Sequence, residues 1–161
     1  VNEKQGDRRS SQPTRYWLAI IDIDNFKKVN DEFGHMVGDE VLLLASRLMG
    51  LTFRATDLLY RYGGEEFVAI VSAADELIAK AIFERLRSSI EAYHFPRVEK
   101  LTVSLGYSQI ATDLLPVEVL SRADRALYQA KEDGRNRIYN FQDLVQAGVF
   151  EETSYLEPEL F

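Results

Sequence analysis

Two apolar runs joined by a pair of glycines limit most strongly how this chain can fold. Residues 58–60 (Leu-Leu-Tyr) and 67–71 (Phe-Val-Ala-Ile-Val) have the composition of β-strands, and Gly63-Gly64 lies between them. A tight turn between antiparallel strands needs positive φ at its central residues, which glycine adopts without strain. The pattern therefore predicts a β-hairpin whose turn is centred on Gly63 and Gly64.

Two adjacent carboxylates follow these glycines, at the start of the second strand. Glu65 and Glu66 occupy positions where a strand normally prefers Thr or Val. Because neighbouring strand residues face opposite sides, the two carboxylates need not serve one purpose. Taken alone, the stretch is most simply a charged hairpin tip. A functional interpretation needs support from the rest of the chain.

Any metal ion bound by this chain should be a hard cation. The chain has no cysteine and only two histidines, His35 and His94, which excludes thiolate ligands and disfavours a zinc site. The apolar run over residues 16–21 predicts a strand buried on both faces, and Asp22 and Asp24 follow it on one face. We favour Asp22 as a cation ligand, and Asp24 as the N-cap of the next helix.

The remaining periodicity predicts an α+β domain. Helical spacing follows Phe26, Asp39, Asp75 and Pro116, and residues 101–108 alternate as a half-buried strand. The order β-α-α-β-β-α-β-α-β favours a ferredoxin-like domain, with an antiparallel-rich central sheet of about five strands and helices mainly on one face. The expected divisions are a linker or truncated N-terminus over 1–15, the domain over 16–141 and a C-terminal extension over 142–161.

Several motifs in a fixed order resemble the GGDEF family, the diguanylate cyclases, in the variant with Glu at the third position of the signature. The matching stretches are residues 22–31, 34–35, 38–39, 61–67, 102–106, 122–131 and 134–136. Several motifs in order are far more specific than any one alone. The resemblance implies the palm fold of nucleotidyl cyclases and polymerases. The chain departs from the family by lacking its N-terminal Asp-x-Leu-Thr motif and the helix which that motif introduces.

The resemblance implies that two GTP molecules are condensed into cyclic di-GMP and two pyrophosphates. Two Mg²⁺ (or Mn²⁺) ions per active site would be held by Asp22, the backbone carbonyl of Ile23, and Glu65. Glu66 is a candidate for a second metal contact or for the proton acceptor, and the sequence leaves the separate roles of Glu65 and Glu66 open. Lys27 completes the expected catalytic set, and it also matches a position that meets phosphate.

The same resemblance implies residues that bind the nucleoside. Asn30 and Asp39 match the guanine readers, and a carboxylate can accept from both donors on the Watson–Crick edge of guanine. Gly63 and Gly64 would let the nucleotide approach the turn closely, and Phe26 also matches a substrate-binding position. Without the resemblance, Asp39 would be taken for a helix N-cap.

Two cations near the end of the last long helix match positions that meet phosphates. These are Lys131 and Arg135, which lie on either side of Gly134, where the helix is expected to end. Fixed cations there would offset the carboxylates of the site. The alternative is that both simply complement the helix dipole.

An Arg-x-x-Asp sequence lies shortly before the hairpin turn. Arg54 and Asp57 match the family's product-inhibition site, where cyclic di-GMP would bind, whereas by themselves they could form a surface ion pair. One chain would carry one GTP, so the resemblance also implies a catalytic homodimer. It further implies control by a regulatory sensor domain missing from this chain.

The overall charge restricts the partners. A net charge of −7 and a pI of about 4.9 argue against binding a nucleic acid polymer or an anionic membrane. No apolar run approaches the roughly 18 residues of a membrane span, and no signal peptide is visible. Because the chain begins at Val1 rather than Met, we expect it to be a piece of a longer protein. The expected location is the cytoplasm, alone or as the cytoplasmic part of a membrane-bound bacterial sensor.

Three functions are compatible with these features of the sequence. The first is an active diguanylate cyclase. The second is a catalytically silent module that binds cyclic di-GMP or GTP as a receptor, but such modules usually lose the carboxylates or glycines that this chain keeps. The third is a palm-type cyclase or polymerase acting on another nucleotide, which Asn30 and Asp39 together argue against.

Overall fold

The computed structural model describes residues 13–151. Most of the expected N-terminal linker and the last ten residues of the acidic tail lie outside this range. The element order matches the prediction, and a short helix follows the last strand. None of the helices within residues 13–151 is long and apolar enough to cross a membrane.

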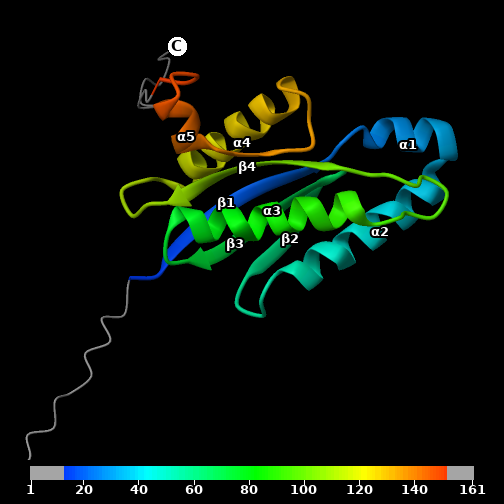
Figure 1. The fold of residues 1–161 in the computed structure, drawn as a ribbon, viewed down its shortest axis with the longest axis horizontal. Coiled ribbons are helices and arrows are strands. Elements are labelled where there is room, and N and C mark those ends of the chain that lie inside the picture. Colours follow the sequence, from blue (N-terminus) through cyan, green and yellow to red (C-terminus); the bar gives the residue numbers. More distant parts are fainter. Residues whose placement is uncertain (1–12, 152–161) are drawn as a thin grey trace, which may run out of the picture.

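A five-stranded mixed sheet forms the centre of the domain (Figure 1). Its order is β2-β3-β1-β4-β5, in which the first three pairings are antiparallel and β4 pairs with β5 in parallel. Strand β1 is central and buried from Trp17 to Ile23, as its continuous apolar sequence predicts. The strands are β1 (Arg15–Ile23), β2 (Leu58–Gly63), β3 (Glu66–Ala73), β4 (Val103–Ile110) and β5 (Ile138–Asn140).

Helices cover both faces of the sheet. Alternate residues of β1 point to opposite sides, so that Trp17, Ala19 and Ile21 pack under α1, α2 and α3, whereas Leu18 and Ile20 pack under α4. The expectation of helices mainly on one face therefore holds for the first three helices. The helices are α1 (Phe26–Phe33), α2 (His35–Thr52), α3 (Glu76–Ala92), α4 (Pro116–Glu132) and α5 (Phe141–Gln146).

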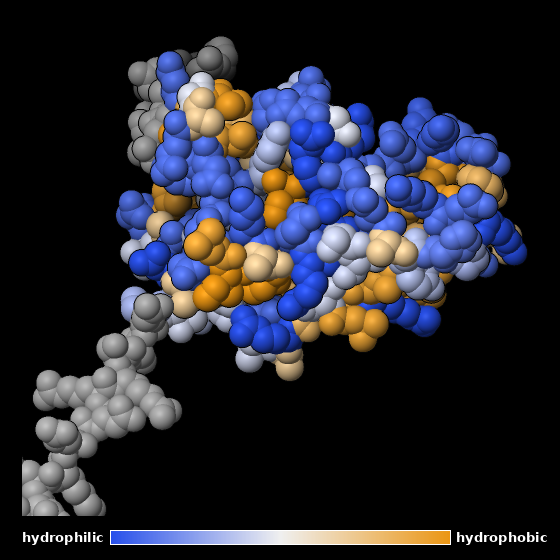
Figure 2. Space-filling view, viewed as in Figure 1, coloured by the Kyte–Doolittle hydropathy of each residue, from blue (hydrophilic) through white to orange (hydrophobic). Residues whose placement is uncertain are grey.

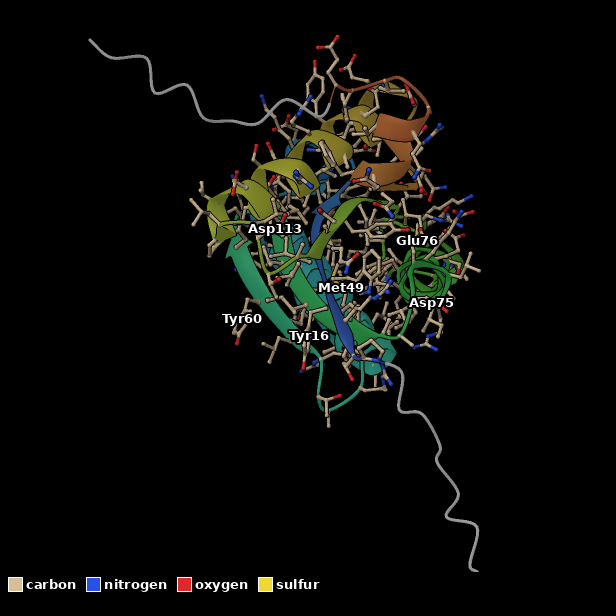
Figure 3. The ribbon with its side chains drawn as sticks, turned by 90° about the vertical axis from the view of Figure 1, so that its left-hand side faces the viewer. Tyr16, Met49, Tyr60, Asp75, Glu76 and Asp113 are labelled. Atoms are coloured by element: carbon tan, nitrogen blue, oxygen red, sulfur yellow. The ribbon has the colours of Figure 1, made fainter. Side chains whose placement is uncertain are left out.

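The face under α4 is only partly covered. Figure 3 shows Met49 on the α3 side of the sheet, while Tyr16 and Tyr60 lie on the side turned away from α3. Both tyrosines are exposed. The surface that carries α3 is mostly hydrophilic, with separate apolar patches (Figure 2).

Strand β4 is not half-buried as its alternating sequence suggested, but buried on both faces over most of its length. The reason is Gly106, where a Cβ would overlap the Ala123 carbonyl and the Leu127 amide of α4. Small residues on this face of β4 therefore indicate close packing of a helix backbone, not exposure to water. This contact sets the position of α4 on the sheet.

The hairpin differs from its prediction at the turn. Gly63 belongs to β2 and pairs with Glu66, so that Gly64 and Glu65 form the connection. Only one of the two glycines, Gly64 (φ 46°), has positive φ. The register also shifts between Arg61 and Gly63, which is a bulge next to the turn.

Candidate active site

A cavity of about 250 Å³ opens at the end of β1, beside the hairpin turn. Its walls come from β1, the start of α1, the turn after β2 and the end of α4 with the following loop. Positions more than 100 residues apart in the sequence thus meet at one place. The residues expected from the sequence that line it are Asp22, Ile23, Phe26, Lys27, Glu65, Lys131 and Arg135.

Asp22 is a buried carboxylate in this cavity, with 6% of its surface exposed. Its Oδ2 accepts a hydrogen bond from Lys131 Nζ at 2.7 Å. Burial raises the pKa of Asp22 from 3.8 to about 6; Lys131 opposes that rise, and the charges of Glu65 and Glu66 add to it. Lys131 therefore balances the negative charge of Asp22 only in part, which favours binding of a further cation.

The hairpin turn brings the two adjacent glutamates to the end of β1. The amide of Ile23 donates to the carbonyl of Glu65 at 3.2 Å. Glu66 is the register partner of Asp22 across the ladder between β1 and β3. Directly opposite residues on antiparallel strands share a face, so the Glu66 and Asp22 side chains lie on the same side of the sheet. Glu65 thus lines the cavity together with Asp22, and the charge of Glu66 also acts on Asp22.

The prediction that Asp24 caps helix α1 is wrong. The N-cap position is Asn25, with φ 55°, and no side chain caps this helix end. Asp24 is instead buried, and its carboxylate accepts hydrogen bonds from Thr102 Oγ1 (2.7 Å), Ser104 Oγ (2.7 Å) and the Asn136 amide (3.0 Å). It therefore joins the end of β1 to the start of β4 and to the loop after α4.

That loop presents Arg135 to the cavity in an unusual backbone conformation. Gly134, Arg135 and Asn136 have φ values of 118°, 64° and 47°, and residues other than glycine adopt this region at a cost. The Asn136 side chain is fixed by two residues of α3: it accepts from Arg87 Nη1 (2.7 Å) and donates to Glu91 Oε2 (2.6 Å). Helix α3 therefore helps to hold the loop in place.

A second cavity, of about 650 Å³, lies between α2 and the hairpin. Asp39 and Arg61 line it together with apolar residues. Helix α2 begins at His35 and not near Asp39 as expected, so Asp39 lies in the second turn and is not its N-cap. The Nε and Nη2 atoms of Arg61 both donate to the Gly64 carbonyl, at 3.0 and 2.7 Å, which ties this cavity wall to the turn.

Asn30 and Phe26 extend from α1 toward the first turn of α2. Their side chains lie next to Gly38, which directly precedes Asp39. The two residues that the sequence assigned to the base, Asn30 and Asp39, therefore both lie at the junction of α1 and α2. The three cations assigned to phosphate, Lys27, Lys131 and Arg135, line the first cavity instead.

Arg54 and Asp57 lie in the loop before β2 and take different environments. The Asp57 side chain is 1% exposed; it accepts from the Arg54 amide (2.8 Å) and from the Ser72 amide (3.4 Å). The Arg54 side chain is 59% exposed, donates from Nη2 to the Ser72 carbonyl (2.6 Å), and lies 3.7 Å from Asp57. Asp57 therefore organises the loop, and Arg54 faces solvent.

The first cavity is chemically suited to a hard cation. Residues 13–151 contain no group of three or more His, Cys, Asp or Glu side chains placed to hold a metal. A metal site would therefore combine Asp22 and Glu65 with the Ile23 carbonyl and with oxygen atoms of a nucleotide. All of these are hard oxygen donors of the kind that Mg²⁺ and Mn²⁺ prefer.

Comparison with known families agrees with this geometry. The family model described as "Diguanylate cyclase, GGDEF domain" matches residues 3–137. The chain belongs to the GGDEF family. The resemblance drawn from the sequence motifs is thereby confirmed, and so is the palm-type α+β fold. Diguanylate cyclases of this family generally use a divalent metal.

The relatives of this GGDEF domain include both full-length proteins and solved domains. The probable diguanylate cyclase DgcT of Escherichia coli K12 is 42% identical over 145 residues, or 85% of this chain and 32% of DgcT. The structure of the GGDEF domain of DgcB from Caulobacter crescentus in complex with c-di-GMP has a TM-score of 0.76 at 32% identity, covering 80% of this chain and 79% of that one.

A second solved relative shares the Glu variant of the signature. The active GGEEF domain of a diguanylate cyclase from Vibrio cholerae has a TM-score of 0.72 at 33% identity, covering 79% of this chain and 83% of that one. By contrast, the chain spans less than half the length of the first curated relatives, between 21% and 45%.

Sequence reasoning missed the residues that hold this GGDEF domain's site together. Asp24 was assigned to a helix cap, and Asn136 and Arg61 were given no role beyond their motifs. A usable signal existed for Asp24, because Thr102 and Ser104 repeat its i, i+2 spacing at the start of another strand and can donate to a carboxylate. For Arg61 and Asn136 the contacts become visible only in the structure.

Proposed function

We propose that this GGDEF domain is one half of a diguanylate cyclase that condenses two GTP molecules into cyclic di-GMP and two pyrophosphates. The observation that carries the proposal is the convergence of Asp22, Glu65, Lys131 and Arg135 on one cavity. Two acidic ligands and two cations in one place suit a nucleoside triphosphate with bound metal. The family match supports the same conclusion.

The reaction is a displacement at phosphorus that occurs twice. The 3′-hydroxyl oxygen of one GTP bonds to the α-phosphorus of the other, the bond from that phosphorus to the pyrophosphate oxygen breaks, and the hydroxyl proton passes to a base. Such a reaction depends mainly on alignment and charge neutralisation. Glu66, on the same side of the sheet as Asp22, is the proposed proton acceptor.

The chain's own residues bind the triphosphate and its metals. Asp22, Glu65 and the Ile23 carbonyl would hold two Mg²⁺ or Mn²⁺ ions, which when bound stabilise the attacking and the leaving oxygen atoms. Lys131 and Arg135 bind phosphate oxygens from the end of α4 and the loop after it. Lys27, which also lines this cavity, binds phosphate from α1.

Guanine recognition is assigned to the junction of α1 and α2. Asp39 accepts hydrogen bonds from the Watson–Crick edge of guanine, Asn30 binds the same base, and Phe26 supports it. Adenine would leave Asp39 and Asn30 without their guanine partners, which supports a preference for GTP. Gly63 and Gly64 keep the turn free of Cβ atoms, so that the nucleotide can lie close to the backbone.

The whole reaction needs a second copy and a means of control. Each copy supplies one GTP, and an antiparallel homodimer places the two nucleotides face to face. Cyclic di-GMP would inhibit by binding at Arg54, whose exposed guanidinium can contact both guanine and phosphate. A sensor domain in the longer, cytoplasmic protein would set the extent of dimerisation.

The proposal is tested with the purified chain, GTP and Mg²⁺, by mass spectrometry of the products. We expect cyclic di-GMP, with a rate that rises more steeply than in proportion to protein concentration because two copies must meet. Titration of cyclic di-GMP into the same protein provides the second measurement. Absence of product at high protein concentration, together with retained binding of cyclic di-GMP, would instead support a receptor.

A further inference from the structure

Gly38 lies buried in the first turn of α2, where α2 meets α1. A Cβ at this position would overlap Asn30 Oδ1, and it would lie 3.0 Å from Asn30 Cγ and 3.3 Å from Phe26 Cζ. Non-bonded carbon atoms pack at about 3.5–4.0 Å, so there is no room for it. The Asn30 amide therefore occupies the space that any side chain at position 38 would take.

The backbone itself does not require glycine here. Gly38 has no positive φ, and its amide donates to the Gly34 carbonyl at 3.1 Å, as expected near the start of a helix. A glycine inside a helix destabilises it by roughly 0.5–1 kcal/mol relative to alanine. The need for glycine at position 38 is therefore one of space, and the group that needs the space is the side-chain amide of Asn30.

We propose that Gly38 is a positioning residue for base recognition. Its missing Cβ lets the Asn30 amide lie over the first turn of α2, next to Asp39, and so sets the preference for guanine over adenine. The inference rests on the proposed function, because it takes Asn30 and Asp39 as the residues that bind the base. It assigns to Gly38 a specificity role that acts through Asn30.

The expected effect is a loss of selectivity. In Gly38→Ala the new methyl group displaces the Asn30 amide, so the hydrogen bonds to guanine weaken while the phosphate contacts stay. Polar groups that are badly placed for a base edge lose discrimination by tenfold or more. We expect the ratio of GDP to ADP affinity, measured by calorimetric titration with Mg²⁺, to fall by about tenfold, chiefly through weaker GDP binding.

Gly50 supplies a matched control in the same helix. Among the described residues, a Cβ on Gly50 would meet nothing within 4 Å outside its own helical turns. Gly50→Ala should therefore keep the GDP to ADP ratio of the wild type, with an unchanged or raised Tm. A general effect of replacing glycine by alanine in α2 would appear in both variants, whereas a positioning effect appears only at Gly38.

A double variant identifies the residue through which Gly38 acts. In Asn30→Ala the displaced amide is gone, so adding Gly38→Ala should cause no further loss of selectivity, and the double variant should recover any Tm that Gly38→Ala alone loses. This variant keeps the test valid even if Gly38→Ala folds poorly. Failure of the double variant to fold would overturn the proposal.

The remaining outcomes separate this inference from the proposed function. A wild-type domain without preference for GDP over ADP would contradict the assignment of the base site, and with it this inference. A selective wild type combined with an equally selective Gly38→Ala variant would overturn the role of Gly38 alone. Equal losses of GDP and ADP affinity would also overturn it, because they indicate an effect on the phosphate site or on the fold.

Discussion

Charge is arranged in opposite ways in the cavity at the end of β1 and in the loop that carries Arg54. In the cavity, Asp22 is buried with its pKa raised to about 6, in spite of the hydrogen bond from Lys131. In the loop, Asp57 is buried as well, but two backbone amides and Arg54 satisfy its carboxylate. The first region retains uncompensated negative charge, and the second exposes a positive one.

This difference indicates what each region is built to bind. A carboxylate whose charge is not balanced within the protein gains stability from an added cation, as a metal site requires. In the loop the Arg54 guanidinium contacts Asp57 and Ser72, but its side chain is 59% exposed, so further donors face solvent and can bind phosphate or guanine.

Glu65→Gln should reduce cyclic di-GMP synthesis by about 10²–10³-fold or more, because it removes a charged metal ligand from the cavity. The Tm should stay near that of the wild type, since Glu65 lies in the turn and not in the core. Initial rates from mass spectrometry provide the measurement. Glu32→Gln, an exposed position on α1, is the control, and a Glu65→Gln variant as active as this control would remove Glu65 from the metal site.

Asp24→Ala should destabilise the fold by about 2–4 kcal/mol, because it leaves three donors without their acceptor. Urea unfolding of the metal-free protein gives this free energy. Asp31→Ala changes an exposed carboxylate on α1 and should cost less than about 0.5 kcal/mol. Equal stability of the two variants would show that Asp24 is not a structural anchor.

Asp22 should make the metal-free protein less stable as the pH rises from about 4 to 6. Its pKa is 3.8 in the unfolded chain and about 6 in the folded one, so the folded state binds more protons in this interval. The destabilisation reaches at most about 3 kcal/mol above pH 6. The difference in unfolding free energy between wild type and Asp22→Asn isolates it, and a difference that rises with pH would contradict the assignment.

Addition of Mg²⁺ sharpens the same measurement. The cation binds the deprotonated carboxylate, so it should restore stability at pH 7 in the wild type and much less in Asp22→Asn. Equal stabilisation of both proteins would place the metal elsewhere.

Arg54→Ala should weaken inhibition by cyclic di-GMP by about tenfold and leave the initial rate of synthesis within about twofold of the wild type. The loop should remain intact, because Asp57 keeps its backbone donors. Inhibition curves at fixed GTP concentration measure the effect, with Arg47→Ala on the exposed side of α2 as control. Undiminished inhibition of the Arg54 variant would locate the inhibitory site elsewhere.

Much of the fold could be predicted from periodicity, because the apolar patterns of the strands and helices are local. The order of nine elements and the central position of residues 16–21 followed from them. The burial of β4 did not, since Gly106 and its serine neighbours look polar and small whether they face water or a helix backbone. The ends of elements, such as the start of α2 at His35 instead of near Asp39, also depend on how helices pack.

The sequence predicted the site residues whose side-chain chemistry is distinctive. It did not predict the residues whose role depends on where the fold places them. Asp22, Glu65 and Lys131 were found because the motifs mark them, and the structure brings them to one cavity. The role of Asp24 depends on hydrogen bonds to residues 78 to 112 positions away, and no local pattern encodes such contacts. The same applies to Asn136, which is fixed from α3.

The close contact at Gly106 determines which substitutions in and near α4 this domain can tolerate. Two backbones touch there, so the absence of a Cβ at Gly106 sets how closely α4 can approach β4. Lys131 follows Leu127 by about one helical turn and inherits its position from that contact. Changes at exposed positions of α4 can therefore accumulate without moving the lysine from Asp22. A single added methyl group at position 106 would push the whole helix, and the lysine with it, away from the strand.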